Sequence, residues 1–414
     1  MIRRLFAIAV MAALPLHAAA QFPRSFFDGL FGSREQVETR RAKQPLEFDY
    51  NVHADWFFVN NEYGASDESY DPSRTMTGIR VTPSLGLRYT HKAGVHRLMG
   101  GIDLLKEFGA NPVGRGAESS VRQENWDIFR EITLFYQFSG GWGKTSFTGV
   151  AGAYPRYLTE GKYTTAILSD KVRFYDNNLE GLLLKFRRPR SYYEVGADWN
   201  GKYGTDRRER FNIFSYGDVY LAKWLHFGWQ AMFQHYAGSV NVKGVVDDHF
   251  LNPWLKFDFT PYVPLQEFSL QTGAFAAYQF DRRAGGSPVF PLGADVVLDV
   301  RNWGVGVRNE AYYGKGLLPF WFDTDAAGNM YGPDLYYRST FWRMDSIPFY
   351  DRLEVYWTPR ITDFLRAKVS AVFHFGDAYF GWQQIATLIF DLDALRHPRR
   401  KEAEVVREVP SIFL

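Results

Sequence analysis

The sequence predicts an all-β fold, a closed antiparallel transmembrane β-barrel of about 16 strands with short periplasmic turns and long extracellular loops. Three observations support this prediction. Apolar and polar residues alternate through most of the chain, the connections between these stretches are short and long in turn, and aromatic residues make up 18% of the sequence. With 414 residues, the chain is long enough for one large barrel or for two or three soluble domains.

The clearest alternation lies in residues 352–375. Leu353, Val355 and Trp357 alternate with charged or polar residues, and the pattern resumes after a short turn at 359–363. A period of two places the two sets on opposite faces of a strand, which predicts an antiparallel hairpin. In a membrane barrel the apolar face contacts lipid and the charged face lines a hydrated lumen. A soluble sandwich, propeller or lectin, which would bury the apolar face, is the alternative fold.

The N-terminus carries the three parts of a secretory signal peptide, expected over residues 1–20. Arg3 and Arg4 precede an apolar stretch at 5–16, and three alanines at 18–20 offer a cleavage site. The chain has no cysteine, which excludes disulfides and leaves closure of the sheet as the main source of stability.

Three further regions are expected after the signal peptide. Residues 21–45 form a short periplasmic or lumenal segment, which is either an amphipathic helix or a loosely ordered lead-in. Residues 46–392 form the barrel. Residues 393–414 form a charged periplasmic tail.

The barrel strands follow from the alternation, taken in chain order. We expect them at 46–58, 79–89, 95–106, 128–138, 147–153, 182–186, 193–199, 211–221, 225–235, 255–259, 268–278, 296–300, 303–311, 352–357, 365–375 and 380–392.

The connections between these strands alternate in length. Short turns follow the even-numbered strands and long polar loops follow most odd-numbered ones, the last, at 376–379, being short. With both termini in the periplasm, the long loops are extracellular. The longest, 314–349, either folds inward to constrict a pore or forms a surface cap.

Tryptophans at strand ends predict two aromatic bands at the membrane interfaces. Those on the long-loop side are Trp56, Trp126, Trp199 and Trp382, and those on the short-turn side are Trp303 and Trp357.

Together these features resemble a Gram-negative outer-membrane β-barrel of porin type, over nearly the whole chain after Leu46. The resemblance implies an outer-membrane location, contact with outer-membrane lipid and lipopolysaccharide, and compatibility with a homo-oligomer. One feature departs from the pattern. Such barrels commonly end on an aromatic residue, whereas here a charged tail follows Leu392.

Charged residues on the inward faces are the candidate lumen lining, and several form a basic wall that would attract anionic solutes. Structural ion pairs filling the interior are the alternative role for each of them. The candidates are Arg301, Arg308, Arg352, Arg366, Lys368, Asp299, Glu310 and Glu354.

The function expected from these observations is a porin-like channel that passes small hydrophilic solutes and is not an enzyme. No cofactor, metal or catalytic residue is assigned, and a net charge of +2 gives no reason to expect a nucleic-acid partner. Two alternatives stay open: a surface-exposed barrel hydrolase or lipid-modifying enzyme, and a structural or secretion-associated barrel that binds a partner.

A hydrolase needs an Asp–His or Ser–His arrangement at the outer rim or on the lipid face. Asp247, Asp248 and His249 lie in a predicted extracellular loop, and His235 lies on the strand leading to it. A carboxylate beside a histidine can orient it for general-base work, although the run is equally ordinary as loop polarity or as a weak cation site.

Overall fold

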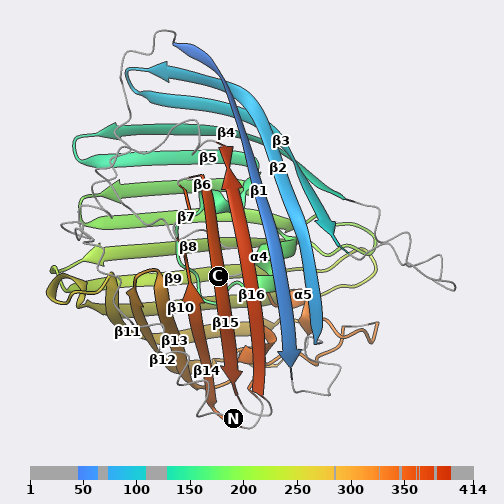
Figure 1. Ribbon diagram of the computed structural model, residues 1–414. Helices are drawn as coiled ribbons and strands as arrows, with labels where there is room; N and C mark the ends of the chain where they lie inside the picture. The colour runs from blue at the N-terminus through green and yellow to red at the C-terminus, as the bar shows by residue number, and fades with distance from the viewer. Residues whose placement is uncertain are drawn as a thin grey trace, which may run out of the picture.

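The protein is described by a computed structural model that covers residues 45–63, 73–108, 128–283, 286–325, 327–344, 347–359, 361–362, 364–376 and 380–392. Sixteen strands form one closed barrel, in which each strand pairs antiparallel with its chain neighbours and β16 pairs with β1 (Figure 1). The predicted fold class and strand number are confirmed. The expected signal peptide, nearly all of the N-terminal segment and the charged tail lie outside the described residues, as does Trp126.

Most strands are longer than the alternation predicted, and the largest difference is at β10, which begins at Val246 rather than Leu255. The strands are β1 (Leu46–Tyr63), β2 (Arg74–His91), β3 (Gly94–Glu107), β4 (Phe129–Trp142), β5 (Thr145–Pro155), β6 (Asn178–Arg188), β7 (Ser191–Gly201), β8 (Arg210–Tyr220), β9 (Leu225–Tyr236), β10 (Val246–Asp258), β11 (Glu267–Asp281), β12 (Leu292–Asn302), β13 (Val305–Gly314), β14 (Phe349–Trp357), β15 (Leu365–Phe375) and β16 (Phe380–Asp391).

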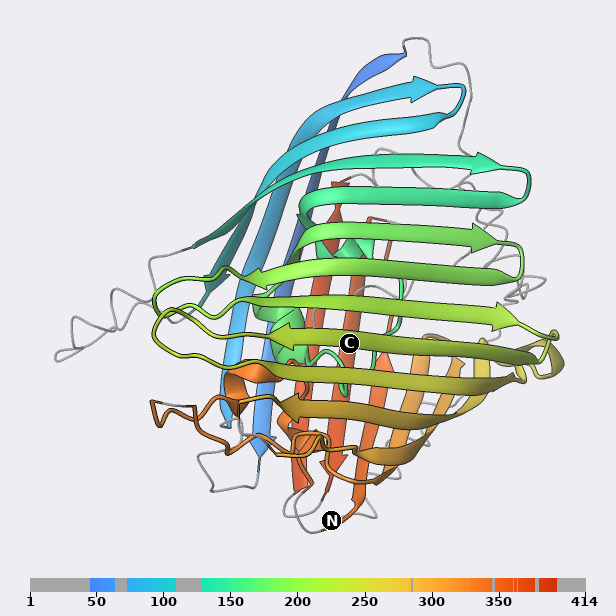
Figure 2. The same ribbon diagram turned by 180° about the vertical axis from the view of Figure 1, so that it is seen from behind.

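The strands are strongly tilted in the barrel wall. In Figures 1 and 2, β5 to β9 run across the view while β1, β15 and β16 run along it. Strands inclined to a barrel axis by about 35–45° cross in this way when opposite walls are seen together.

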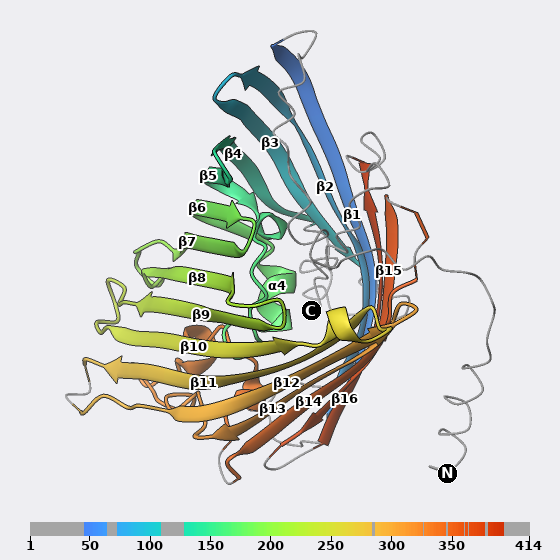
Figure 3. The ribbon, with the colours of Figure 1, turned by 90° about the vertical axis from the view of Figure 1, so that its left-hand side faces the viewer.

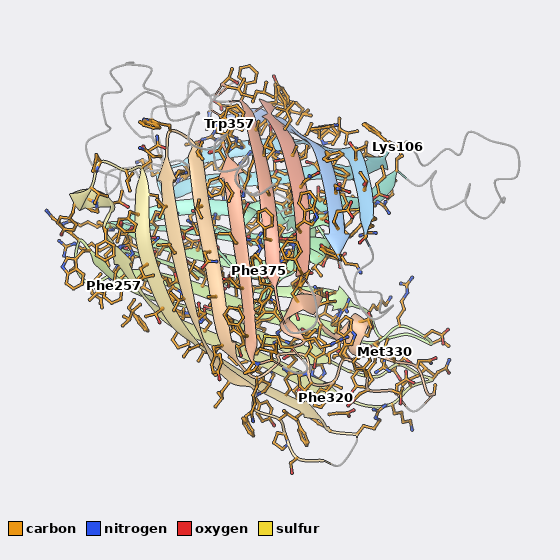
Figure 4. All side chains as sticks on the ribbon, turned by 60° about the horizontal axis from the view of Figure 1, so that its bottom comes forward. Lys106, Phe257, Phe320, Met330, Trp357 and Phe375 are labelled. Carbon is orange, nitrogen blue, oxygen red and sulfur yellow. The ribbon has the colours of Figure 1, made fainter. Side chains whose placement is uncertain are left out.

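The two faces of the wall differ as the alternation requires. Large apolar side chains such as Leu85, Ile132 and Leu134 point outward and are 61%, 63% and 60% exposed. The short-turn ends of β12 to β15 carry exposed Trp303 and Trp357, and the latter lies at the end of β14 away from Phe320 and Met330 in Figure 4. An apolar outer belt with aromatic ends is the surface that a bilayer solvates.

The connections follow the predicted order, short after even-numbered strands and mostly long after odd-numbered ones. One of the two-residue turns consists of Trp303 and Gly304, which have positive φ angles of 51° and 79°. Two such residues form the hairpin turn whose twist matches the flanking strands. In the described part of the chain, no helix has the length and apolar character needed to cross a membrane.

A first inserted segment, residues 156–177, enters the lumen between β5 and β6. It contains η1 (Arg156–Leu158) and α4 (Asp170–Tyr175), and α4 lies inside the ring of strands in Figure 3. Glu194 of β7 holds its first turn by accepting bonds from the backbone N–H groups of Glu160 and Gly161 and from the Tyr163 hydroxyl. Bonds to a charged acceptor are about twice as strong as neutral ones, so this carboxylate anchors the segment.

A second inserted segment, residues 315–348, also folds inward and contains α5 (Gly332–Leu335) and η3 (Thr340–Trp342). It hydrogen-bonds the first: the Ser169 N–H donates to the Tyr337 carbonyl at 2.7 Å, and the Ser339 N–H donates to the Thr165 carbonyl at 3.0 Å. Trp342 is fully buried at this junction. Of the two positions predicted for the longest loop, the described residues show the inward one, and the two segments pack against each other inside the lumen.

Candidate functional site

The predicted lumen-lining residues all lie on the inward faces of β12 to β15, where most of them contact one another. The carboxylate of Glu354 lies 3.1 Å from Arg352 and 2.7 Å from Lys368. Arg308 lies 3.0 Å from Asp299. Their side chains are mostly buried, and Glu310 accepts a bond from Thr164 of the first inserted segment.

Arg301 and Arg366 complete the predicted set. Arg301 lies 3.6 Å from Glu267 of β11, and Arg366 lies on the inward face of β15 beside Lys368. These ion pairs and hydrogen bonds join neighbouring strands of the wall to one another and, through Glu310, to the first inserted segment.

Most histidines that face inward are held by neighbours on the ring nitrogens. In His374, Nδ1 lies 2.8 Å from the Tyr350 hydroxyl and Nε2 lies 2.9 Å from Gln383, while the ring stacks on Phe341. His226 is 2% exposed and lies 3.1 Å from Asp218. A general base needs a nitrogen that a substrate can reach, and these buried rings do not offer one.

His235 differs because it lies on the outer face of β9, one residue before the strand ends. Its Nδ1 lies 3.7 Å from Oδ1 of Asp247, and the imidazole is 28% exposed. The other oxygen of Asp247 accepts a 2.6 Å bond from Nε of Arg282, whose side chain is 56% exposed. We define His235, Asp247 and Arg282 as the rim site.

Strand register builds the rim site from three elements. His235 is the direct partner of Asp247 across β9 and β10, and Arg282 follows the last residue of β11. On the other side, the His235 ring stacks on Phe211 at 5.0 Å, and Phe211 stacks on Trp199 at 5.3 Å. This aromatic row fixes the plane of the imidazole and turns Nδ1 toward the carboxylate.

The rim site faces the membrane. Phe233 and Leu251, on the same faces of β9 and β10, are 49% and 44% exposed and belong to the apolar belt. The connection 237–245 lies on the long-loop side of the barrel, so the site sits where the apolar belt meets the long-loop rim.

The predicted placement of Asp247, Asp248 and His249 in a loop was wrong. These residues lie in β10, paired with both β9 and β11. The alternation failed there because two carboxylates occupy adjacent positions and Pro253, a residue uncommon inside strands, follows them. As a result Asp247 and His249 face outward, whereas Asp248 faces the lumen and pairs with Arg338.

The chemistry available at the rim site is proton transfer next to a fixed positive charge. At 3.7 Å Asp247 lies beyond hydrogen-bond distance of Nδ1, but its charge favours the imidazolium, and Nε2, on the opposite side of the ring, can accept a proton. The guanidinium of Arg282 has further N–H donors beyond the one used on Asp247. Among the described residues no group of three or more His, Asp or Glu side chains is placed to hold a metal ion.

Comparison with known families gives a match to the lipid A 3'-O-deacylase-type family over residues 39–281, more than half of the chain. The chain belongs to this family. No curated protein matches it significantly. The matched residues contain β1 to β11 and, within them, His235 and Asp247 of the rim site.

Several solved structures are similar in the barrel. A loop-deletion mutant of OmpT, an outer-membrane protein of Vibrio cholerae, has 8% identity and a TM-score of 0.47, over 84% of this chain and 100% of that chain. OmpF of Salmonella typhi has 9% identity and a TM-score of 0.44, over 84% and 98%. A mutant porin of Rh. blastica has 10% identity and a TM-score of 0.39, over 83% and 100%.

The family corrects two expectations from the sequence. A porin-like channel that is not an enzyme was the wrong function, because the matching family is one of outer-membrane lipid A deacylases. Strand alternation reports what each face of a wall contacts and does not show whether the lumen is open. The barrel and the family together place the chain in an outer membrane.

The sequence alone singles out His235 and Asp247 without pairing them across two strands, and it gives no indication of Arg282 or of the aromatic row. The signal that could have paired His235 with Asp247 is the alternation of inward and outward residues along β9 and β10. Once β10 is extended back to Val246, Asp247 and His249 fall on the face that carries Leu251 and Leu255.

Proposed function

We propose that the protein is a hydrolase that removes an ester-linked acyl chain from lipid A in the outer leaflet. The observation that carries the proposal is the Asp247–His235 pair on the lipid-facing rim, within the segment matched by the deacylase-type family. Lipid A presents its esters at the level where acyl chains meet head groups. An exposed imidazole at the edge of the apolar belt lies at that level.

The reaction is a water-mediated ester hydrolysis. Nε2 of His235 takes a proton from water as the water oxygen bonds to the ester carbonyl carbon. The carbon–oxygen bond to the sugar then breaks, and His235 returns the proton to the departing alkoxide, which gives a fatty acid and a free hydroxyl. Asp247 stabilises the imidazolium that forms in between, and Arg282 supplies positive charge for the developing oxyanion.

The test is an acyl-release assay with purified protein and lipid A in mixed micelles, followed by mass spectrometry. Loss of a general base lowers rates by about 10²–10⁴-fold, so His235→Gln should lower kcat/KM by that factor. His249→Gln is the matched control, because His249 lies on the same outer face between Phe233 and Tyr278 but does not belong to the rim site. Full activity in His235→Gln, or equal losses in both variants, would exclude the assignment.

The proposed activity also implies where in the cell the protein lies and which way its barrel faces. Lipid A is a lipid of Gram-negative outer membranes, so the chain is inferred to be exported by its N-terminal signal and inserted there, with the rim site facing outward. Proteolysis of intact cells should cleave a tag placed in the connection 237–245 and spare a tag in the β8–β9 turn at 221–224. The reverse pattern would invert the topology and remove the site from the outer leaflet.

A further inference from the structure

A second surface feature lies apart from the rim site, where β12 begins and β13 ends. It is a groove of about 420 Å³. The residues that line it are Leu292, Tyr313, Gly314, Lys315, Gly316, Met344, Ile347 and Pro348. Leu292 and Tyr313 face outward and are 58% and 66% exposed. The volume lies within the range of ligand sites on proteins, about 300–1,000 Å³.

The backbone around the groove is fixed. The Lys315 N–H donates to the Leu292 carbonyl at 2.9 Å, and the Gly314 N–H donates to the Pro348 carbonyl at 2.9 Å. At Gly316 a Cβ atom would lie 1.8 Å from the carbonyl oxygen of Arg343, so only glycine allows this approach. These contacts hold the two ends of the second inserted segment together and form the groove without a ligand.

The lining combines an apolar trough with a single charge. Leu292, Ile347 and Pro348 offer aliphatic surface, and Lys315 is the one charged residue among the eight. The groove continues the lipid-facing surface, since Val296, on the same face of β12 as Leu292, is 44% exposed. An occupant with an aliphatic chain and an anionic group complements both features.

We propose that this groove binds one acyl chain of an outer-leaflet lipid whose phosphate pairs with the Lys315 ammonium. The lipid is favoured over other occupants because the trough opens onto the belt that acyl chains already contact. The cation lies on the long-loop side, where head groups begin. Phosphate is the anionic group that a lysine binds as a point charge.

The groove is distinct from the rim site. Leu292 pairs with Ala276, and Ala276 pairs with Leu251, which is four residues from Asp247 on β10. With strands about 4.8 Å apart and a rise of about 3.4 Å per residue, the two features are roughly 17 Å apart. Binding in the groove therefore does not require that the rim site be catalytic.

The experiment measures lipid retention by native mass spectrometry in the His235→Gln background, so that hydrolysis cannot remove the probe. The probes are bis-phosphorylated lipid A and its dephosphorylated form. Lys315→Met should weaken binding of the phosphorylated probe about tenfold, and Leu292→Trp, which fills the trough from an exposed position, should weaken binding of both. Lys223→Met is the matched control, an exposed lysine in the β8–β9 turn.

Three outcomes would overturn the proposal. The first is that the Lys315→Met and Lys223→Met variants bind lipid equally well. The second is that Leu292→Trp leaves lipid retention unchanged. The third is that inorganic phosphate alone displaces the lipid probe. Since the readout is binding rather than hydrolysis, an inactive rim site and an empty groove give separable results.

Discussion

Asp247 and Asp248 are neighbours in the chain and lie on opposite faces of the barrel wall. Asp247 faces the membrane interface, where Arg282 and an exposed imidazole contact it. Asp248 faces the lumen, where both of its oxygens bond the guanidinium of Arg338, and the two side chains are 2% and 3% exposed. Because a strand has a period of two, the same group at adjacent positions pairs with an exposed Arg282 on one face and with a buried Arg338 on the other.

The two carboxylates are similarly buried, at 4% and 2% exposed, and the difference between them lies in the exposure of their partners. Arg338 belongs to the second inserted segment and is enclosed by Phe250 and Tyr336, so no solute reaches the pair. Arg282 is exposed, and in the proposed mechanism the carboxylate it holds acts on the neighbouring His235. Substitutions at Asp248 and at Asp247 test this contrast, with the larger effect expected at Asp248.

The largest effect is expected from Asp248→Asn, which leaves the Arg338 guanidinium buried without its anionic partner. Breaking such a buried pair costs about 3–5 kcal/mol, so the free energy of unfolding should fall by this amount. Acyl release per folded molecule should stay at the wild-type value. Urea titration in lipid vesicles measures the first quantity, and the lipid A assay measures the second.

The double substitution Asp248→Leu with Arg338→Met supplies the control. Replacing both members of a buried ion pair by apolar residues is often neutral, so most of the lost stability should return. A variant at 248 that stayed stable but lost activity would place Asp248 in the catalytic site and end the contrast.

The second effect is expected from Asp247→Asn, which keeps the shape of the side chain and removes its charge. Asp247 acts through His235, at a separation of 3.7 Å. The loss in kcat should therefore be roughly 10–10²-fold, smaller than that of removing the base itself. KM should change little, since Asp247 contacts no substrate atom in the proposed mechanism, and stability should fall by less than in Asp248→Asn because Arg282 stays exposed to solvent.

Steady-state kinetics on lipid A separate these quantities. Asp247→Glu retains the carboxylate and should recover part of kcat. If KM rises while kcat is unchanged, Asp247 acts in substrate binding and not in orienting the imidazole.

How much of the fold and of the rim site the sequence predicts depends on the physical signal that each region carries. The alternation around Leu353 and Val355 predicted strands, faces and closure, because lipid contact imposes a strict period of two. The inserted segments carry no such period. Residues 164–168, which lie buried in the lumen, were not assigned at all, since their partners come from distant strands.

The rim site was only half predictable for the same reason. Arg282 lies just after the end of β11, where the alternation no longer shows which way a side chain points. Its contact with Asp247 also spans 35 positions in the chain. Adjacent charges at Asp247 and Asp248 are unfavourable in a strand with one lipid-facing side, so the pattern favoured a loop. In the proposed mechanism Asp247 is kept there for catalysis, and functional sites are where such failures of the local pattern are expected.

The smallest effect concerns Asp323 and Asp325, two carboxylates of the second inserted segment outside the strands. Burial raises the pKa of Asp325, but bonds from the N–H groups of Asn329 and Ala327 and from Arg208 outweigh it, so its pKa lies below the usual value of 3.8. Burial, with the charge of Asp281 nearby, raises the pKa of Asp323. The two carboxylates therefore respond to pH with opposite signs.

A lowered folded-state pKa gives stability that is present above pH 3.8 and lost as the pH falls through the folded-state value. Asp325→Asn should therefore destabilise the protein at pH 7 by about 1 kcal/mol or less, the usual size for a solvent-screened group, and the deficit should shrink at pH 3. Asp323→Asn should stabilise it at pH 7, because the raised pKa makes the charged form a cost there, and this gain should also vanish at low pH. Thermal unfolding of both variants at the two pH values checks the signs, and a deficit for Asp325→Asn that persisted at pH 3 would show that the side chain contributes its shape and not its charge.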